Sequence, residues 1–243
     1  MKTNKSYVGK QRKRTEGGYG KIVLIILGVA VILIFLYFGI RIAAIRNSPD
    51  FDLNKISVYY FVYPVNTSNI ENLLETKAKN KLLIVSGEKK AIYMIDVPVT
   101  LFINSKKLDA TKGSPRDFLT YFVDLLSLKP DYSYVVYQKE EFFQKANVKD
   151  INNLVQVYSK HGLRLSDYLS LSKQVTALRP ESAITEAALA KLYYALGRFS
   201  IETMELPLIT SMPIKITVDG NVYYRTYLDE EKLPELAKNF QNK

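Results

Sequence analysis

The hydrophobic pattern of the chain begins with one long apolar segment. Residues 22–40 read IVLIILGVAVILIFLYFGI and contain no charged side chain. At about 1.5 Å per residue, a helix over this segment is roughly 28 Å long, close to the hydrocarbon thickness of a bilayer. A helix that is apolar on every face is either buried in a large core or spans a membrane, and this length favours the membrane. The pattern therefore predicts a transmembrane helix over residues 22–40.

From Asn47 onward, strand-like and helix-like segments alternate. Runs of β-branched and aromatic residues predict strands, and apolar residues spaced three and four apart predict helices. The expected strands cover residues 56–63, 82–85, 91–97, 132–137, 201–208, 214–218 and 222–227, and the expected helices cover 69–79, 115–126, 139–146, 150–158, 166–178, 182–196 and a last one from 230. The alternation predicts one α/β domain with a central mixed β-sheet over residues 47–243. A tight turn at residues 87–89 makes the strands on either side antiparallel neighbours.

The positive charge of the chain is concentrated beside the apolar segment. The chain has a net charge of +10, and its first 21 residues hold seven Lys/Arg against one acidic residue. The part of the chain from Asn47 onward holds 25 basic and 23 acidic residues, so its charge is nearly balanced. This balance argues against nucleic-acid binding by the domain. The positive-inside rule places the basic tail, residues 1–21, in the cytoplasm and the domain outside. The apolar run is longer than that of a cleaved signal peptide and lacks a small-residue cleavage site, so we expect an uncleaved signal anchor in the cell membrane.

The residue inventory excludes several kinds of catalytic site. The chain has no cysteine and one histidine, so a zinc site or a histidine-based triad is not expected. His161 precedes Gly162 at an expected helix end, where a histidine interacts with the last carbonyl groups. The 18 tyrosines suit either packing on the sheet or a tyrosine-lined pocket for a lipid chain or sugar, and their spacing leaves both interpretations open.

Four short motifs occur in a recognisable order along the domain. They are Lys79-Asn80-Lys81, Asp96-Val97-Pro98-Val99-Thr100, Lys107-Leu108-Asp109-Ala110-Thr111 and the segment 166–174, SDYLSLSKQ. In these motifs and in the order of its elements, the chain resembles a divergent member of the LytR-CpsA-Psr family of bacterial cell-envelope proteins. That resemblance implies a basic cytoplasmic tail, one transmembrane helix, and an extracytoplasmic α/β domain that transfers glycopolymers from a polyprenyl-pyrophosphate carrier.

The motifs depart from the family pattern at charged positions. Val99 stands where the family has an arginine, Ser170 and Lys173 replace two further arginines, and no acidic residue occurs within residues 79–81. Arginine grips phosphate with two parallel hydrogen bonds, whereas lysine offers a point charge. Loss of one positioned donor costs roughly 3–4 kcal/mol of transition-state stabilisation. The departures therefore predict reduced or lost transfer, while binding of the lipid carrier could survive.

By this resemblance, the pyrophosphate would be bound by a set of polar side chains. They are Lys79, Lys81, Asp109, Asp167, Lys173 and Gln174. No catalytic residue and no metal ligand is assigned, and a divalent cation such as Mg²⁺ is expected only if transfer is retained. The expected partners are the lipid bilayer and a polyprenyl-phosphate-linked glycan.

Two alternatives do not require that ligand. In the first, the same fold serves as a non-catalytic, membrane-tethered scaffold in envelope assembly. In the second, the protein is an accessory subunit of a transport or secretion system. Whether the chain is an enzyme stays open at this point.

Overall fold

The computed structural model describes residues 18–65, 69–218 and 220–241, which form two compact units, Met1–Ala44 and Ile45–Lys243. Residues 1–17 of the expected basic tail lie outside the described part. Helix α1 (Gly18–Arg46) contains the expected span, and its stretch Ile22–Arg46, with a mean hydropathy of 3.1, is long and apolar enough to cross a membrane. The chain thus consists of one N-terminal apolar helix followed by an α/β domain.

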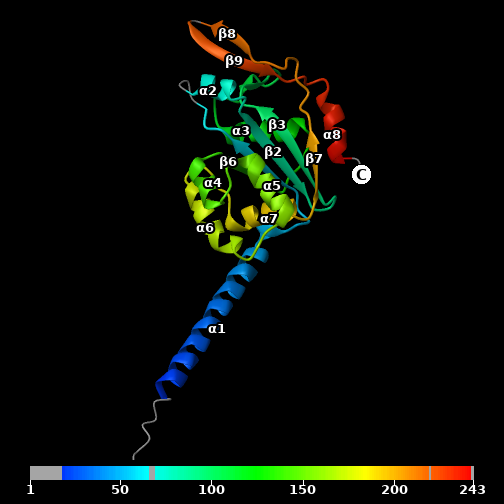
Figure 1. Ribbon diagram of the computed structural model, residues 1–243. Coiled ribbons are helices and arrows are strands. Elements are labelled where there is room, and N and C mark those ends of the chain that lie inside the picture. The colour runs from blue at the N-terminus through cyan, green and yellow to red at the C-terminus, as the bar shows by residue number, and fades with distance from the viewer. Residues whose placement is uncertain (1–17, 66–68, 219, 242–243) are drawn as a thin grey trace, which may run out of the picture. The chain divides into compact units, whose positions relative to one another are not determined.

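A five-stranded mixed sheet forms the centre of the domain (Figure 1). Its strands, in spatial order, are β6 (Tyr132–Tyr137), β1 (Ser57–Val62), β2 (Lys79–Ser86), β3 (Ala91–Pro98) and β7 (Ser200–Met204). Strand β2 pairs antiparallel with both β1 and β3, whereas β6 and β7 pair parallel with their neighbours. The predicted mixed sheet and the predicted antiparallel hairpin are both confirmed.

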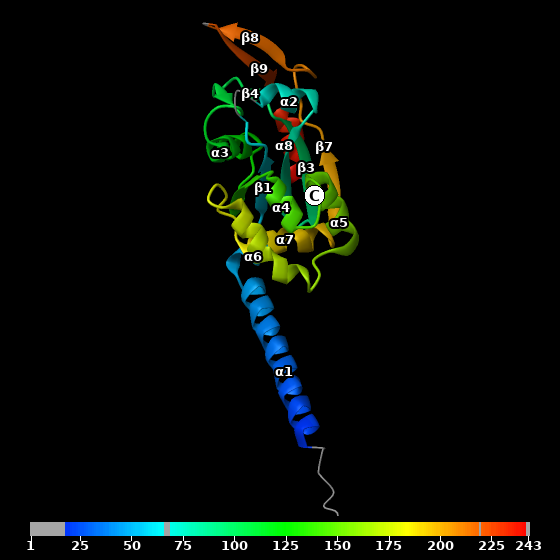
Figure 2. The ribbon, with the colours of Figure 1, turned by 60° about the vertical axis from the view of Figure 1, so that its left-hand side comes forward.

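A second, four-stranded sheet stands apart from the first (Figure 2). Its strands, in order, are β5 (Leu108–Asp109), β4 (Leu101–Ile103), β9 (Asn221–Tyr227) and β8 (Ile214–Val218). The antiparallel hairpin of β8 and β9 therefore joins the chain after β3 instead of extending the central sheet. The hydroxyls of Thr100 and Thr226, 2.9 Å apart, hydrogen-bond where the two chain segments meet.

Helices cover both faces of the central sheet. On one face, α3 (Pro115–Leu125) and α8 (Leu233–Gln241) pack on alternate strand residues such as Tyr60, Leu82 and Ile95. On the other lie α4 (Glu140–Lys145), α5 (Ile151–His161), α6 (Asp167–Leu178) and α7 (Glu186–Leu196) (Figure 1). The Tyr59 hydroxyl donates to the carbonyl of Ala188 in α7 at 2.7 Å. The two-residue period of a strand thus sends neighbouring tyrosines into opposite helix layers.

Three predicted element boundaries differ from the structure by four residues each. The helix expected over 69–79 is only α2 (Ile70–Glu75), because Lys77 has a φ of 52° that ends the helix, and Lys79 already pairs with Pro98 in the sheet. The strand expected over 201–208 ends at Met204. The helix expected over 182–196 begins at Glu186, where the Thr185 hydroxyl accepts a hydrogen bond from the Ala188 amide.

A buried lysine joins α7 to the segment that leads into the sheet. The Lys191 amine donates to the carbonyls of Asp52 and Lys55, at 2.6 and 2.7 Å, and to the Ser57 hydroxyl at 2.8 Å. These three acceptors use all three hydrogens of an ammonium group. Burial lowers the pKa of Lys191 from 10.5 to about 8, although the nearby carboxylate of Asp52 opposes this shift.

We expect Lys191→Met to lower the free energy of unfolding by about 3 kcal/mol, because it leaves buried acceptors without a donor. Since the folded-state pKa of Lys191 is depressed, the unfolded chain binds more protons than the folded chain between about pH 8 and pH 10.5. The free energy of unfolding should therefore rise with pH across this range in the unaltered protein, and this rise should be absent from Lys191→Met. Denaturant unfolding across this pH range measures both effects. The exposed Lys149→Met is the control, and equal stability curves for the two variants would contradict the prediction.

Candidate functional site

The candidate site lies at the end of the central sheet where β1 and β6 finish and β2 begins. Val62 pairs with Tyr137, and Lys79 opens the adjacent strand. Alternation along β2 directs Asn80 toward α3, and it directs Lys79 and Lys81 toward the opposite face. One short segment therefore supplies polar groups to two different surfaces.

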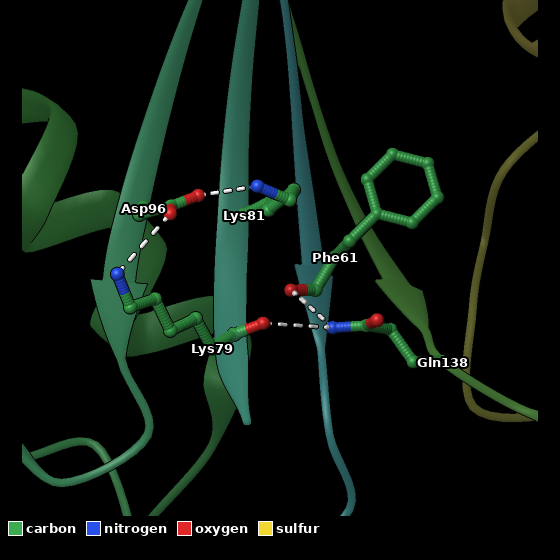
Figure 3. Close-up of polar contacts among 5 residues, drawn as sticks. All are labelled: Phe61, Lys79, Lys81, Asp96 and Gln138. Atoms are coloured by element: carbon green, nitrogen blue, oxygen red, sulfur yellow. Dashed lines mark hydrogen bonds and ion pairs between the residues drawn. The ribbon is translucent and has the colours of Figure 1, made fainter. Parts of the chain in front are cut away.

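A cationic pair surrounds one carboxylate on the first surface (Figure 3). The Lys81 amine contacts one oxygen of Asp96, and the Lys79 amine lies 3.3 Å from the other. The Lys81 side chain is 8% exposed and that of Lys79 is 55% exposed, so the group is open to solvent on the Lys79 side. Burial raises the pKa of Asp96, but the two lysines, Lys81 above all, outweigh burial and hold that pKa below its ordinary value.

A buried glutamine lies beside this pair. The Gln138 amide nitrogen donates to the carbonyls of Phe61 and Lys79, both at 3.4 Å (Figure 3). Its side-chain oxygen is buried and has no hydrogen-bond partner among the described residues. Buried acceptors are normally satisfied, so this oxygen is an exception within the packed end of the sheet.

A cavity of about 190 Å³ lies on the second surface, between the sheet and the loop that leads into α3. Asn80 is its central polar group: its nitrogen donates to the Tyr60 hydroxyl at 3.2 Å, and its oxygen accepts from the Tyr63 amide at 2.9 Å. The remaining lining is mostly apolar and aromatic, contributed by Val62, Pro64, Val65, Ala110, Thr111, Gly113, Pro115, Phe118 and Tyr137. Tyr60, Tyr63 and Tyr137 line this cavity, whereas Tyr59 and Tyr193 are core residues.

Asp109 lies next to this cavity but is already paired. One of its oxygens accepts from the Thr111 amide and hydroxyl, at 3.0 and 2.6 Å. The other accepts from Nε of Arg225 in β9 at 3.3 Å. The Arg225 guanidinium also lies over the Phe102 ring, 4.1 Å from its centroid. Asp109 therefore joins β5 to β9 within the second sheet, next to the cavity.

The three predicted residues of α6 lie elsewhere. Asp167 accepts from the Arg164 amide at 2.7 Å, and Lys173 is exposed. Gln174 is fully buried: it donates to the Ser170 hydroxyl at 2.8 Å and accepts from Tyr193 at 2.7 Å. Among the described residues, no hydrogen bond or ion pair joins these three to the residues on β2 or β5.

The six predicted site residues thus form three groups: Lys79 with Lys81, Asp109 alone, and the three of α6. Their role in binding pyrophosphate stays a prediction. Sequence reasoning did not assign Asp96, Gln138 or Arg225 to the site. The tight turn after Ser86 carried a usable signal for Asp96, because counting back along the hairpin places it opposite Lys81. Nothing in the sequence pointed to Arg225.

The carboxylates of the site do not fit a divalent cation as they stand. Asp96 is shared by two lysines, and Asp109 is held by Arg225 and Thr111. In the described part of the chain, no three His, Asp or Glu side chains gather in a way that could hold a metal ion. The expected Mg²⁺ therefore stays a prediction, and no step is assigned to it.

Comparison with known proteins identifies the fold. No family model matches the chain, and no curated protein sequence does. Among solved structures, the protein described as the transcriptional regulator YvhJ from Bacillus subtilis is 12% identical, with a TM-score of 0.50 over 77% of this chain and 96% of that one. B. subtilis TagT is 15% identical over 79% and 91% of the two chains, with a TM-score of 0.42. Another TagT structure, of a LytR-CPS2A-Psr family protein with bound octaprenyl pyrophosphate, has a TM-score of 0.39 at the same identity and coverage.

The domain shares the fold of the YvhJ structure. At these identities the likeness concerns the fold alone.

We expect Lys81→Met to raise the pKa of Asp96, because the variant removes the closer of two ammonium groups from a half-buried carboxylate. The stability that Asp96 contributes is present above its unfolded-state pKa and is lost as the pH falls through its folded-state pKa. Acid unfolding should therefore begin at a higher pH in the variant. Carboxyl-carbon NMR titration measures the pKa, with Lys149→Met as the control, and an unchanged Asp96 pKa in Lys81→Met would show that the ion pair is absent in solution.

Proposed function

We propose that the protein is a membrane-anchored cell-envelope protein whose extracytoplasmic domain binds a polyprenyl-phosphate-linked glycan, with its transfer chemistry reduced or lost. The apolar helix keeps the domain at the membrane surface, where such lipids reside. The excess of basic residues before the helix supports a cytoplasmic N-terminus.

The observation that carries the proposal is the sharing of Asp96 by two lysines at the open end of the sheet. Phosphate and carboxylate oxygens accept the same charge-assisted hydrogen bonds from ammonium groups. A phosphate can therefore take up the exposed Lys79 amine while Lys81 stays on Asp96.

The cavity on the other side of β2 supports an apolar component of the ligand. Its aromatic and aliphatic lining begins at Asn80, one residue from both lysines. A hydrocarbon chain gains free energy in such a lining by leaving water. The ligand class to test is a polyprenyl pyrophosphate, the class of lipid present in one TagT structure.

The charged groups support weak or absent transfer. Lysines stand at the sheet end, Val99 is buried and apolar, and Asp109 is tied to Arg225. Phosphoryl-transfer catalysis consists mostly of positioning and of neutralising charge on the phosphates. A site with two point charges and no free carboxylate is better suited to binding a polyprenyl-phosphate-linked glycan than to catalysing its transfer.

The test is thermal unfolding of the full-length chain in nanodiscs with added polyprenyl pyrophosphate. Ligand at about 100 times its Kd should stabilise the folded state by about 2.7 kcal/mol. The double variant Lys79→Ala/Lys81→Ala should lose most of this stabilisation, because it removes the phosphate partner Lys79 and also the Lys81 ammonium group that neutralises Asp96. Lys149→Ala, which removes an exposed lysine of the helical region, should keep it.

Two other outcomes would change the proposal. Loss of binding in Lys173→Ala with no loss in the β2 double variant would place the phosphates on α6, as the motif resemblance implies. No stabilisation of the unaltered protein would contradict lipid binding and favour the non-catalytic scaffold.

A further inference from the structure

The turn before α6 and its first turn expose two leucines. Leu165 is 73% exposed and Leu169 is 44% exposed, although the helix between and beyond them is well packed, with Tyr168 and Leu171 buried. Two basic side chains, Lys160 and Arg164, are exposed on the same stretch of chain. The acidic residue there, Asp167, accepts a hydrogen bond from the Arg164 backbone amide. Exposed leucines flanked by basic residues are typical of segments that lie in a membrane interface.

A hydrogen bond ties this segment to the start of the folded unit. Nε of Arg46 donates to the Tyr168 hydroxyl at 3.1 Å. Ile45, the first residue of the same compact unit, is buried. Arg46 follows Ile40, the last residue of the expected hydrocarbon span, by six residues, or about 9 Å of helix. Chain connectivity alone therefore holds the Tyr168 region close to the lipid headgroups if residues 22–40 span the bilayer.

We propose that this region, the α6 surface defined by Arg46, Lys160, Arg164, Leu165 and Leu169, rests on the bilayer and binds anionic lipid headgroups. The two leucines enter the boundary between headgroups and acyl chains, and the three basic side chains pair with lipid phosphates. This contact would fix the orientation of the domain on the membrane, which a single helical anchor alone leaves free. The inference rests on the membrane span and is independent of glycan-lipid binding.

The chain lacks tryptophan, so one introduced tryptophan is a site-specific probe. Leu165→Trp is placed in the full-length protein in nanodiscs made with anionic lipid. Its emission should shift to shorter wavelength, and lipids brominated near the top of the acyl chain should quench it. Leu165 is exposed, so the fold tolerates the larger ring.

The matched control is Met212→Trp, at a 77% exposed apolar position in the segment before β8. It should remain unshifted and unquenched, because an exposed apolar residue alone does not produce membrane contact. Equal quenching at both positions, or none at Leu165→Trp, would overturn the proposal.

Charge is tested separately in the Leu165→Trp background. Adding Lys160→Gln/Arg164→Gln should reduce the quenching. The Leu165→Trp protein with both basic residues intact should also be quenched less in nanodiscs of neutral lipid, or in high salt. If the extent of quenching is the same with anionic and neutral lipid, at low and high salt, and with and without these substitutions, the binding of anionic headgroups is contradicted. Since no polyprenyl ligand is present, the result is separate from that of the binding test above.

Discussion

Strand β1 is buried along its whole length and pairs on both edges, antiparallel with β2 and parallel with β6. These two pairings fix the end of the sheet at which Lys79, Gln138 and the tyrosine-lined cavity meet. The alternation of β1 side chains also divides the core. Tyr60 stacks on Phe118 of α3, whereas Tyr59 reaches α7. The position of the candidate site therefore depends on this one strand.

Because β1 is buried on both faces, the charged groups that serve it lie at the two ends of the sheet. At one end, the Lys191 amine donates three hydrogen bonds to the segment that leads into β1. At the other, Lys81 and Asp96 neutralise each other across the β2–β3 hairpin. Charges deep in a sheet are costly unless they are paired, so both ends use paired or fully hydrogen-bonded groups. At the end with Lys79, one of the two lysines that share the carboxylate of Asp96 stays exposed.

The second sheet is separate from the central five-stranded sheet. Its strand β9 bonds through Thr226 to Thr100, which lies between β3 and β4, and Arg225 of β9 pairs with Asp109 of β5 within the sheet. Both contacts join residues more than 110 positions apart in sequence. The second sheet lies beside the loop that lines the cavity, so its β9 strand supports the cavity wall without contributing to it. The fold therefore separates the support of the candidate site, in β9, from its polar groups, in β2 and β6.

The sequence determined the features that depend on local pattern: the apolar span, the alternation of strands and helices, the helix start at Ser114, and the antiparallel hairpin around Gly87. Each follows from residue spacing or from backbone chemistry within a few positions. The hairpin register even places Lys81 opposite Asp96. Only the tertiary structure decided that β8 and β9 form a separate sheet and that Arg225 holds Asp109. It alone also showed that Gln174 is buried against Tyr193, away from Lys79, because these contacts join segments far apart in the chain, and their pairing depends on how the whole core packs.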